Sequence, residues 1–175
     1  MARKLTHWEY SFLLHTCNLG ESQVTRTNPF TGEPVIVHID DGLSVEERRA
    51  IQAVFAEHGI EGPEPDFEGY AMCSDDDSLR FRCDDLDGDA PISNFEVEVV
   101  VKQLSDELLA IVLDVARAGN LALMSSVGDC VRIAHDAPAA TLIKRWPDAE
   151  PLSSIADLRE WLQQKIEGRR VRISS

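Results

Sequence analysis

Four acidic residues in one short segment have the types and spacing that bind calcium. In DLDGDAPISNFE, residues 85–96, Asp85, Asp87 and Asp89 hold the first, third and fifth positions and Glu96 the twelfth. Ca²⁺ takes about six to eight oxygen ligands, and carboxylates spaced along a tight turn supply several of them, with a final glutamate binding through both oxygens. The spacing therefore predicts a candidate metal site at Asp85, Asp87, Asp89 and Glu96.

The same segment resembles the binding loop of an EF-hand, and Ile92 stands at the eighth position, where such a loop has its short pairing strand. The sixth position requires glycine for a sharp turn, but this chain has Ala90, followed by Pro91, which favours extended backbone before it. An EF-hand loop joins two helices, whereas the flanking segments 78–83 and 96–101 have strand patterns. The resemblance covers this loop only and implies no family. We expect a solvated acidic connection, with a calcium-binding module as the alternative.

A second set of reactive residue types lies near residue 130. Cys130, His135 and Asp136 have the types of a thiol nucleophile, its base and an orienting carboxylate. All three lie along one predicted strand and the residues that follow it. Side chains along an extended strand do not come together, so this spacing does not favour a catalytic set. The chain has no phosphate-binding glycine loop, dinucleotide fingerprint or metalloprotease helix motif. An enzyme whose site is assembled from distant segments, without a linear motif, stays open as an alternative.

The acidic charge is concentrated in one region. The chain carries a net charge of −14, and residues 61–98 hold thirteen acidic side chains against two arginines, a local net of −11. Such a field repels phosphate backbones, so we expect no nucleic-acid binding, and it attracts a basic protein. The predicted partner-binding residues are the aspartates of this region: Asp75, Asp76, Asp77, Asp84, Asp85, Asp87 and Asp89.

The start of the chain and the cysteines indicate the compartment. His7, Glu9 and His15 interrupt the apolar N-terminal segment, which we interpret as a first strand and not as a signal peptide. No apolar run reaches the roughly 18 residues of a membrane span. The four cysteines form no close pair, so we expect reduced thiols and no bound metal. We therefore expect a cytoplasmic protein without a membrane segment or cofactor.

The elements that must position these residues follow from periodicity and capping signals. Serine caps and amphipathic spacing predict three helices, near residues 45–58, 105–118 and 154–167. Strand patterns lie at residues 7–15 and 95–102, and hairpin signals at 23–40, 70–83 and 121–135. The sequence predicts one α+β domain over residues 1–175, a mainly antiparallel sheet with three flanking helices. A weak internal repeat indicates two β-α-β-β units.

The favoured function is that of a small acidic protein-binding protein without catalytic activity. Its acidic region would meet a basic partner, as in the bacterial immunity proteins that neutralise basic toxins, an analogy of class only. The two alternatives are the calcium-binding module at residues 85–96 and the enzyme with a motif-less site.

Overall fold

The computed structural model describes residues 6–20, 22–64, 68–74, 77–126, 131–134, 140–166 and 168–172. Within these residues the protein has ten strands and four helices, which confirms the predicted α+β class. The helices are α1 (Val45–Glu57), α2 (Asp106–Ala118), α3 (Ala140–Arg145) and α4 (Ile155–Gln164). The strands are β1 (Thr6–Thr16), β2 (Gln23–Thr27), β3 (Pro34–His38), β4 (Gly69–Cys73), β5 (Ser78–Arg82), β6 (Asn94–Val101), β7 (Leu121–Ser125), β8 (Val131–Ile133), β9 (Glu150–Pro151) and β10 (Arg169–Arg172).

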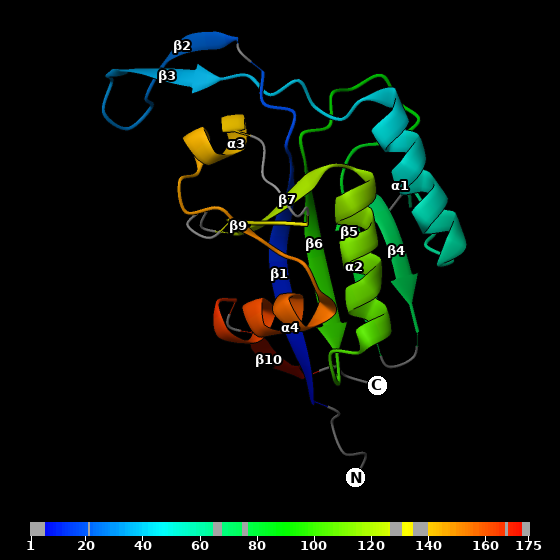
Figure 1. Cartoon of the computed structure of the whole chain (residues 1–175). Coiled ribbons are helices and arrows are strands. Elements are labelled where there is room, and N and C mark those ends of the chain that lie inside the picture. Colours follow the sequence, from blue (N-terminus) through cyan, green and yellow to red (C-terminus); the bar gives the residue numbers. More distant parts are fainter. Residues whose placement is uncertain are drawn as a thin grey trace.

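Strand β1 lies at the centre of the main sheet. It pairs with β6 along one edge, while along its other edge β7 pairs with its C-terminal half and β10 with its N-terminal half. The path of neighbouring strands is β4-β5-β6-β1-β7-β8-β9. Strands β8 and β9 run parallel, and the other pairs in this sheet run antiparallel. The two ends of β1 therefore have different surroundings (Figure 1).

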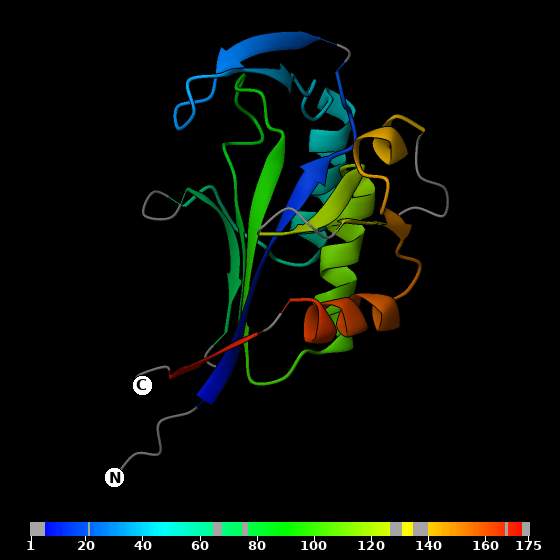
Figure 2. The same ribbon diagram turned by 90° about the vertical axis from the view of Figure 1, so that its left-hand side faces the viewer.

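One face of the main sheet, here called the helix face, carries the core. Strand alternation directs four fully buried side chains of β6 to this face: Phe95, Val97, Val99 and Val101. Helices α1, α2 and α4 cover it (Figure 2). The rings of Phe55 in α1 and Phe81 in β5 lie 5.1 Å apart, and those of Phe12 in β1 and Trp161 in α4 lie 5.7 Å apart. Burial of these large rings helps to hold α1 and α4 to the sheet.

The opposite face, here called the open face, is polar over β5 and β6. Cross-strand ion pairs join Arg80 to Glu98 at 3.2 Å and Arg82 to Glu96 at 3.4 Å. All four side chains are substantially exposed, so each pair contributes little to stability. Over β7 and β8 this face instead carries a second apolar cluster, which includes fully buried Leu142 of α3.

Three of the helices begin at serine caps that the sequence predicts. The Ser44 hydroxyl accepts a hydrogen bond from the Glu47 amide, and the Glu47 side chain accepts one from the Ser44 amide. Ser105 caps α2, and Ser154 caps α4. Helix α4 ends at Gln164, before the predicted end at residue 167. None of the helices in the described part of the chain has the length and apolar composition to cross a membrane.

The fourth helix, α3, corrects the expectation of three helices. It has six residues, TLIK flanked by Ala140 and Arg145, and its sequence carries no serine cap or long amphipathic repeat. Helices this short are not stable alone, so tertiary packing forms α3, through Leu142 in the second apolar cluster. The short strands β9 and β10 were likewise not predicted.

The predicted pair of β-α-β-β units is not built as two equivalent units. The chain order β3-α1-β4-β5 and β6-α2-β7-β8 matches the prediction, but β3 pairs with β2 in a separate two-stranded sheet. Residues 22–39, which contain this hairpin, are called the arm below. Figures 1 and 2 both show the arm projecting from the end of the main sheet where β1 finishes.

Candidate interaction surface

The predicted partner-binding aspartates do not form one cluster. Asp77 precedes β5 and Asp84 follows it, so the two lie at opposite ends of a five-residue strand, about 17 Å long. The Asp77 carboxylate accepts a hydrogen bond of 3.0 Å from the Lys102 amide, beside the N-terminus of α2. Asp75 and Asp76 lie outside the described residues. The remaining aspartates, Asp84, Asp85, Asp87 and Asp89, belong to one segment, residues 84–89, called the acidic loop below.

Helix α1 holds the backbone of the acidic loop. The Arg48 guanidinium donates two hydrogen bonds to carbonyl oxygens, to Gly88 at 2.7 Å and to Ala90 at 2.6 Å. One turn further along α1, the Gln52 amide donates to the Asp87 carboxylate at 2.8 Å. A planar guanidinium binds two acceptors at once with fixed geometry. Arg48 therefore fixes the path of the loop relative to α1.

The start of the acidic loop is anchored by Tyr70 of β4. The Tyr70 hydroxyl accepts a hydrogen bond from the Leu86 amide at 3.0 Å and donates to the Asp85 carboxylate at 3.3 Å. Burial raises the pKa of Tyr70 to about 12, with smaller contributions from Asp85 and Cys83, so the hydroxyl keeps its proton at neutral pH. Leu86 is only 3% exposed and packs in the main core. The loop thus has a hydrogen-bonded and a hydrophobic anchor.

The carboxylates of this anchored loop face solvent. Asp84, Asp85, Asp87 and Asp89 are all exposed. Among the residues that the structure describes, Asp84 and Asp89 have no hydrogen-bond or ion-pair partner, because Arg48 binds carbonyl oxygens and not carboxylates. Asp84 and Asp89 therefore present exposed carboxylates on an anchored backbone.

The four predicted calcium ligands do not converge. Glu96 lies on β6, where its carboxylate pairs with Arg82 on the open face. The Asp85 carboxylate accepts one hydrogen bond from the Asp87 amide, within the same loop, and one from the Tyr70 hydroxyl. The carbonyls of the loop bind the Arg48 guanidinium. Within the described residues no group of three or more His, Cys, Asp or Glu side chains is arranged to hold a metal ion.

The arm exposes apolar side chains that sequence reasoning did not single out. Phe30 at its tip is 95% exposed and Ile36 on β3 is 66% exposed. The Asn28 side chain accepts hydrogen bonds from the Phe30 amide at 2.9 Å and the Thr31 amide at 3.3 Å, and Gly32 takes a φ of 73°. These contacts hold the turn, so Phe30 stands at the end of an ordered hairpin. Apolar side chains grouped on one exposed element are typical of protein interaction sites.

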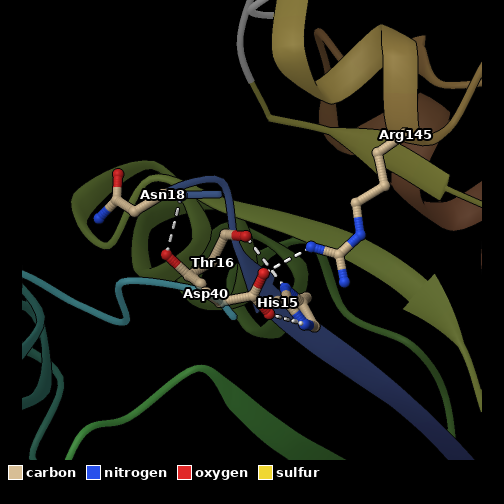
Figure 3. Close-up of polar contacts among 5 residues, drawn as sticks. All are labelled: His15, Thr16, Asn18, Asp40 and Arg145. Carbon is tan, nitrogen blue, oxygen red and sulfur yellow. Dashed lines mark hydrogen bonds and ion pairs between the residues drawn. The ribbon is translucent and has the colours of Figure 1, made fainter. Parts of the chain in front are cut away.

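An ionic network fixes the root of the arm (Figure 3). Asp40, which follows the arm and is 11% exposed, lies 3.1 Å from Nε2 of His15 and 2.5 Å from a guanidinium nitrogen of Arg145. The Arg145 guanidinium also lies 4.9 Å from the centre of the Trp146 ring, and that ring meets His15 edge to face. The network joins the end of β1, the exit of the arm and the end of α3, so the arm is tied to the body.

The pair of His15 and Asp40 has the residue types of a general base, but not its geometry. Nε2 of His15 faces Asp40, and Nδ1 lies 3.0 Å from the backbone oxygen of Thr16. Both ring nitrogens face acceptors within the protein, so neither is directed at a substrate. The residues of the predicted thiol set, Cys130, His135 and Asp136, lie outside the described part of the chain.

The arm and the acidic loop lie at the same end of the main sheet. The Leu43 amide donates to the Ile92 carbonyl at 2.8 Å, which joins the segment leaving the arm to the segment leaving the loop. Gly42 lies beside the same carbonyl with a φ of 73°, where an added Cβ would be 3.1 Å from that oxygen. Both views of the chain show the two features at this end of the main sheet (Figures 1 and 2). They form one candidate interaction surface.

Comparison of the chain with family models, with curated proteins and with solved structures found no match.

Proposed function

We propose that this is a protein-binding protein without catalytic activity, and that its acidic loop meets a basic partner. The observation that carries the proposal is the combination of an anchored loop backbone with exposed carboxylates that have no partner among the described residues, at Asp84 and Asp89. A loop backbone that is held in place before binding costs less conformational entropy when the partner docks. The exposed carboxylates also raise the rate of association with a basic surface.

The arm supports the same function with a different kind of contact. Exposed carboxylates raise the association rate and the specificity of binding more than the affinity. Apolar side chains buried at the centre of an interface contribute most of the affinity. Phe30 and Ile36 provide such side chains on the arm, at the same end of the main sheet as the acidic loop. We propose that the partner is a basic protein of the cytoplasm that also offers an apolar surface to the arm. A basic toxin, neutralised in an immunity-like manner, fits this chemistry.

Affinity capture with three matched baits tests the proposal. The baits are the wild-type protein, the double variant Asp84→Asn with Asp89→Asn, and a control with Glu107→Gln and Glu160→Gln. The control removes the same charge from exposed positions on α2 and α4, away from the acidic loop. At low salt we expect wild type and control to retain the same basic protein from an extract of the native host, and the aspartate variant to lose most of it. Equal retention by all three baits would contradict the proposal.

A second variant separates the two contacts. Phe30→Ala removes the apolar tip of the arm without a change of charge. We expect faster dissociation of the captured partner and a nearly unchanged association rate, because short-range apolar contacts act mainly on dissociation. An unchanged dissociation rate would remove the arm from the interface while leaving the role of the acidic loop intact.

A further inference from the structure

Among the residues that the structure describes, a gap opens in the main sheet beside the middle of β1, between β7 and β10. Strand β7 pairs with β1 from Phe12 onward, and β10 pairs with β1 only as far as Glu9. Tyr10 and Ser11 therefore have no strand neighbour on this edge in the described part of the chain. Because backbone groups of alternate residues in an antiparallel sheet point to alternate sides, one of these two residues directs its N–H and C=O into the gap.

Polar side chains from distant parts of the chain surround a cavity of about 250 Å³ at this gap. Register places Glu9 and Ser11 on the open face and Ser125 on the helix face, so the cavity is lined from both faces of the sheet. The other polar lining residues are Ser126 after β7, Lys165 after α4 and Arg169 at the start of β10. Convergent polar groups in a concave site are typical of a small-ligand site.

Two observations indicate the charge of the ligand. The hydroxyl oxygen of Ser125 is buried without a hydrogen-bond partner, and a buried unpaired hydroxyl is costly unless something binds it. Lys165 and Arg169 have no hydrogen-bond or ion-pair partner for their side chains among the described residues. Two free cations and three hydroxyls are donors for oxygen atoms that carry negative charge.

We propose that this cavity binds a small tetrahedral oxyanion, a phosphate group held by Lys165, Arg169 and the serine hydroxyls. The carboxylate of Glu9 also lines the cavity, so its ionic groups sum to +1. The acidic loop does not cancel this local charge, since seven residue steps along β1, about 23 Å, separate Glu9 from Thr16, where the strand ends. That distance exceeds the screening length of about 8 Å at physiological salt.

Calorimetric titration with inorganic phosphate, at ionic strength held constant with chloride, tests this site. We expect saturable binding of one phosphate per chain, weakened about tenfold by Arg169→Gln and by Lys165→Gln, since each removes a charge-assisted hydrogen bond. Ser125→Ala should weaken binding severalfold. Glu9→Gln should strengthen it about threefold, because it removes the negative charge in the cavity.

The matched control is Arg170→Gln, the neighbouring arginine of β10, whose side chain points to the other face of the sheet. We expect it to leave phosphate binding unchanged. Absence of saturation for the wild-type protein would overturn the proposal, and so would equal weakening by the Arg169 and Arg170 variants. For Glu9→Gln we expect a gain of phosphate affinity, a result that loss of folding cannot produce. Weaker phosphate binding by this variant would also overturn the proposal and indicate a ligand with an ammonium group.

Discussion

Replacing Arg48 with methionine tests whether the acidic loop is anchored by α1. The change keeps the apolar stem of the side chain and removes two hydrogen bonds, of 2.7 Å to Gly88 and 2.6 Å to Ala90. A hydrogen bond from a charged donor contributes about 1.5–3 kcal/mol when buried. Arg48 is only half-buried and water competes for its acceptors, so about 1 kcal/mol for each bond is the better value. We expect the free energy of unfolding to fall by about 2 kcal/mol, measured by urea denaturation.

The loop itself should report the same loss. A local loss of about 2 kcal/mol corresponds to about thirtyfold faster amide exchange over residues 84–92, if the loop opens independently of the core. Arg49→Met is the control, because Arg49 is the adjacent, exposed arginine of α1 and the charge change is identical. It should change stability by less than about 0.5 kcal/mol. Equal effects of the Arg48 and Arg49 variants on stability and exchange would refute the anchoring of the loop by Arg48.

Three further outcomes follow from the contacts described. Asp40→Asn, which breaks the ionic network at the root of the arm, should lower the unfolding free energy by about 2 kcal/mol in a denaturation experiment; an unaltered midpoint would contradict the role of the network. Burial raises the pKa of the Cys17 and Cys83 thiols to about 12, so at about pH 8 iodoacetamide should modify exposed Cys73 before these two, as mass spectrometry of each site would show. Hydrogen bonds from the serines at the start of α4 lower the pKa of Asp157, and its stabilising effect is present above about pH 4 and lost as pH falls through the lowered value. The stability difference between wild type and Asp157→Asn should therefore shrink from about pH 5 to about pH 3, and a difference that grows would contradict the cap.

Local signals were sufficient for much of the fold. The box of Ser44 and Glu47 begins α1 at the predicted residue, because both partners of the cap lie within one turn of sequence. The alternation of Phe95 to Val101 gives β6 directly. The pairing of β3 with β2, away from the main sheet, depends on long-range packing that no local pattern encodes. Helix α3 depends in the same way on the burial of Leu142.

The candidate surface was predicted only in part. The acidic character of residues 84–89 is visible in the sequence, but its anchor is not, since Arg48 lies forty residues from Gly88 in the chain. The contact of His15 with Asp40 likewise joins residues twenty-five positions apart in the chain. Phe30 lies within the predicted hairpin of residues 23–40, and only the structure shows that nothing in the described part of the chain covers it. Strand β5 separates Asp77 from the acidic loop, a spacing that charge counting along the chain does not reveal.

The most direct test of the central proposal is the association rate of the captured basic partner as a function of salt. Two fixed carboxylates near the contact raise the rate at low salt by steering, and added salt screens that effect. For the wild-type protein and for the Glu107→Gln, Glu160→Gln control we expect the rate to fall steeply as salt rises. For Asp84→Asn with Asp89→Asn we expect a rate about three- to tenfold lower at low salt and a flatter dependence. Identical salt dependence for all three proteins would contradict the proposal that the acidic loop meets the partner.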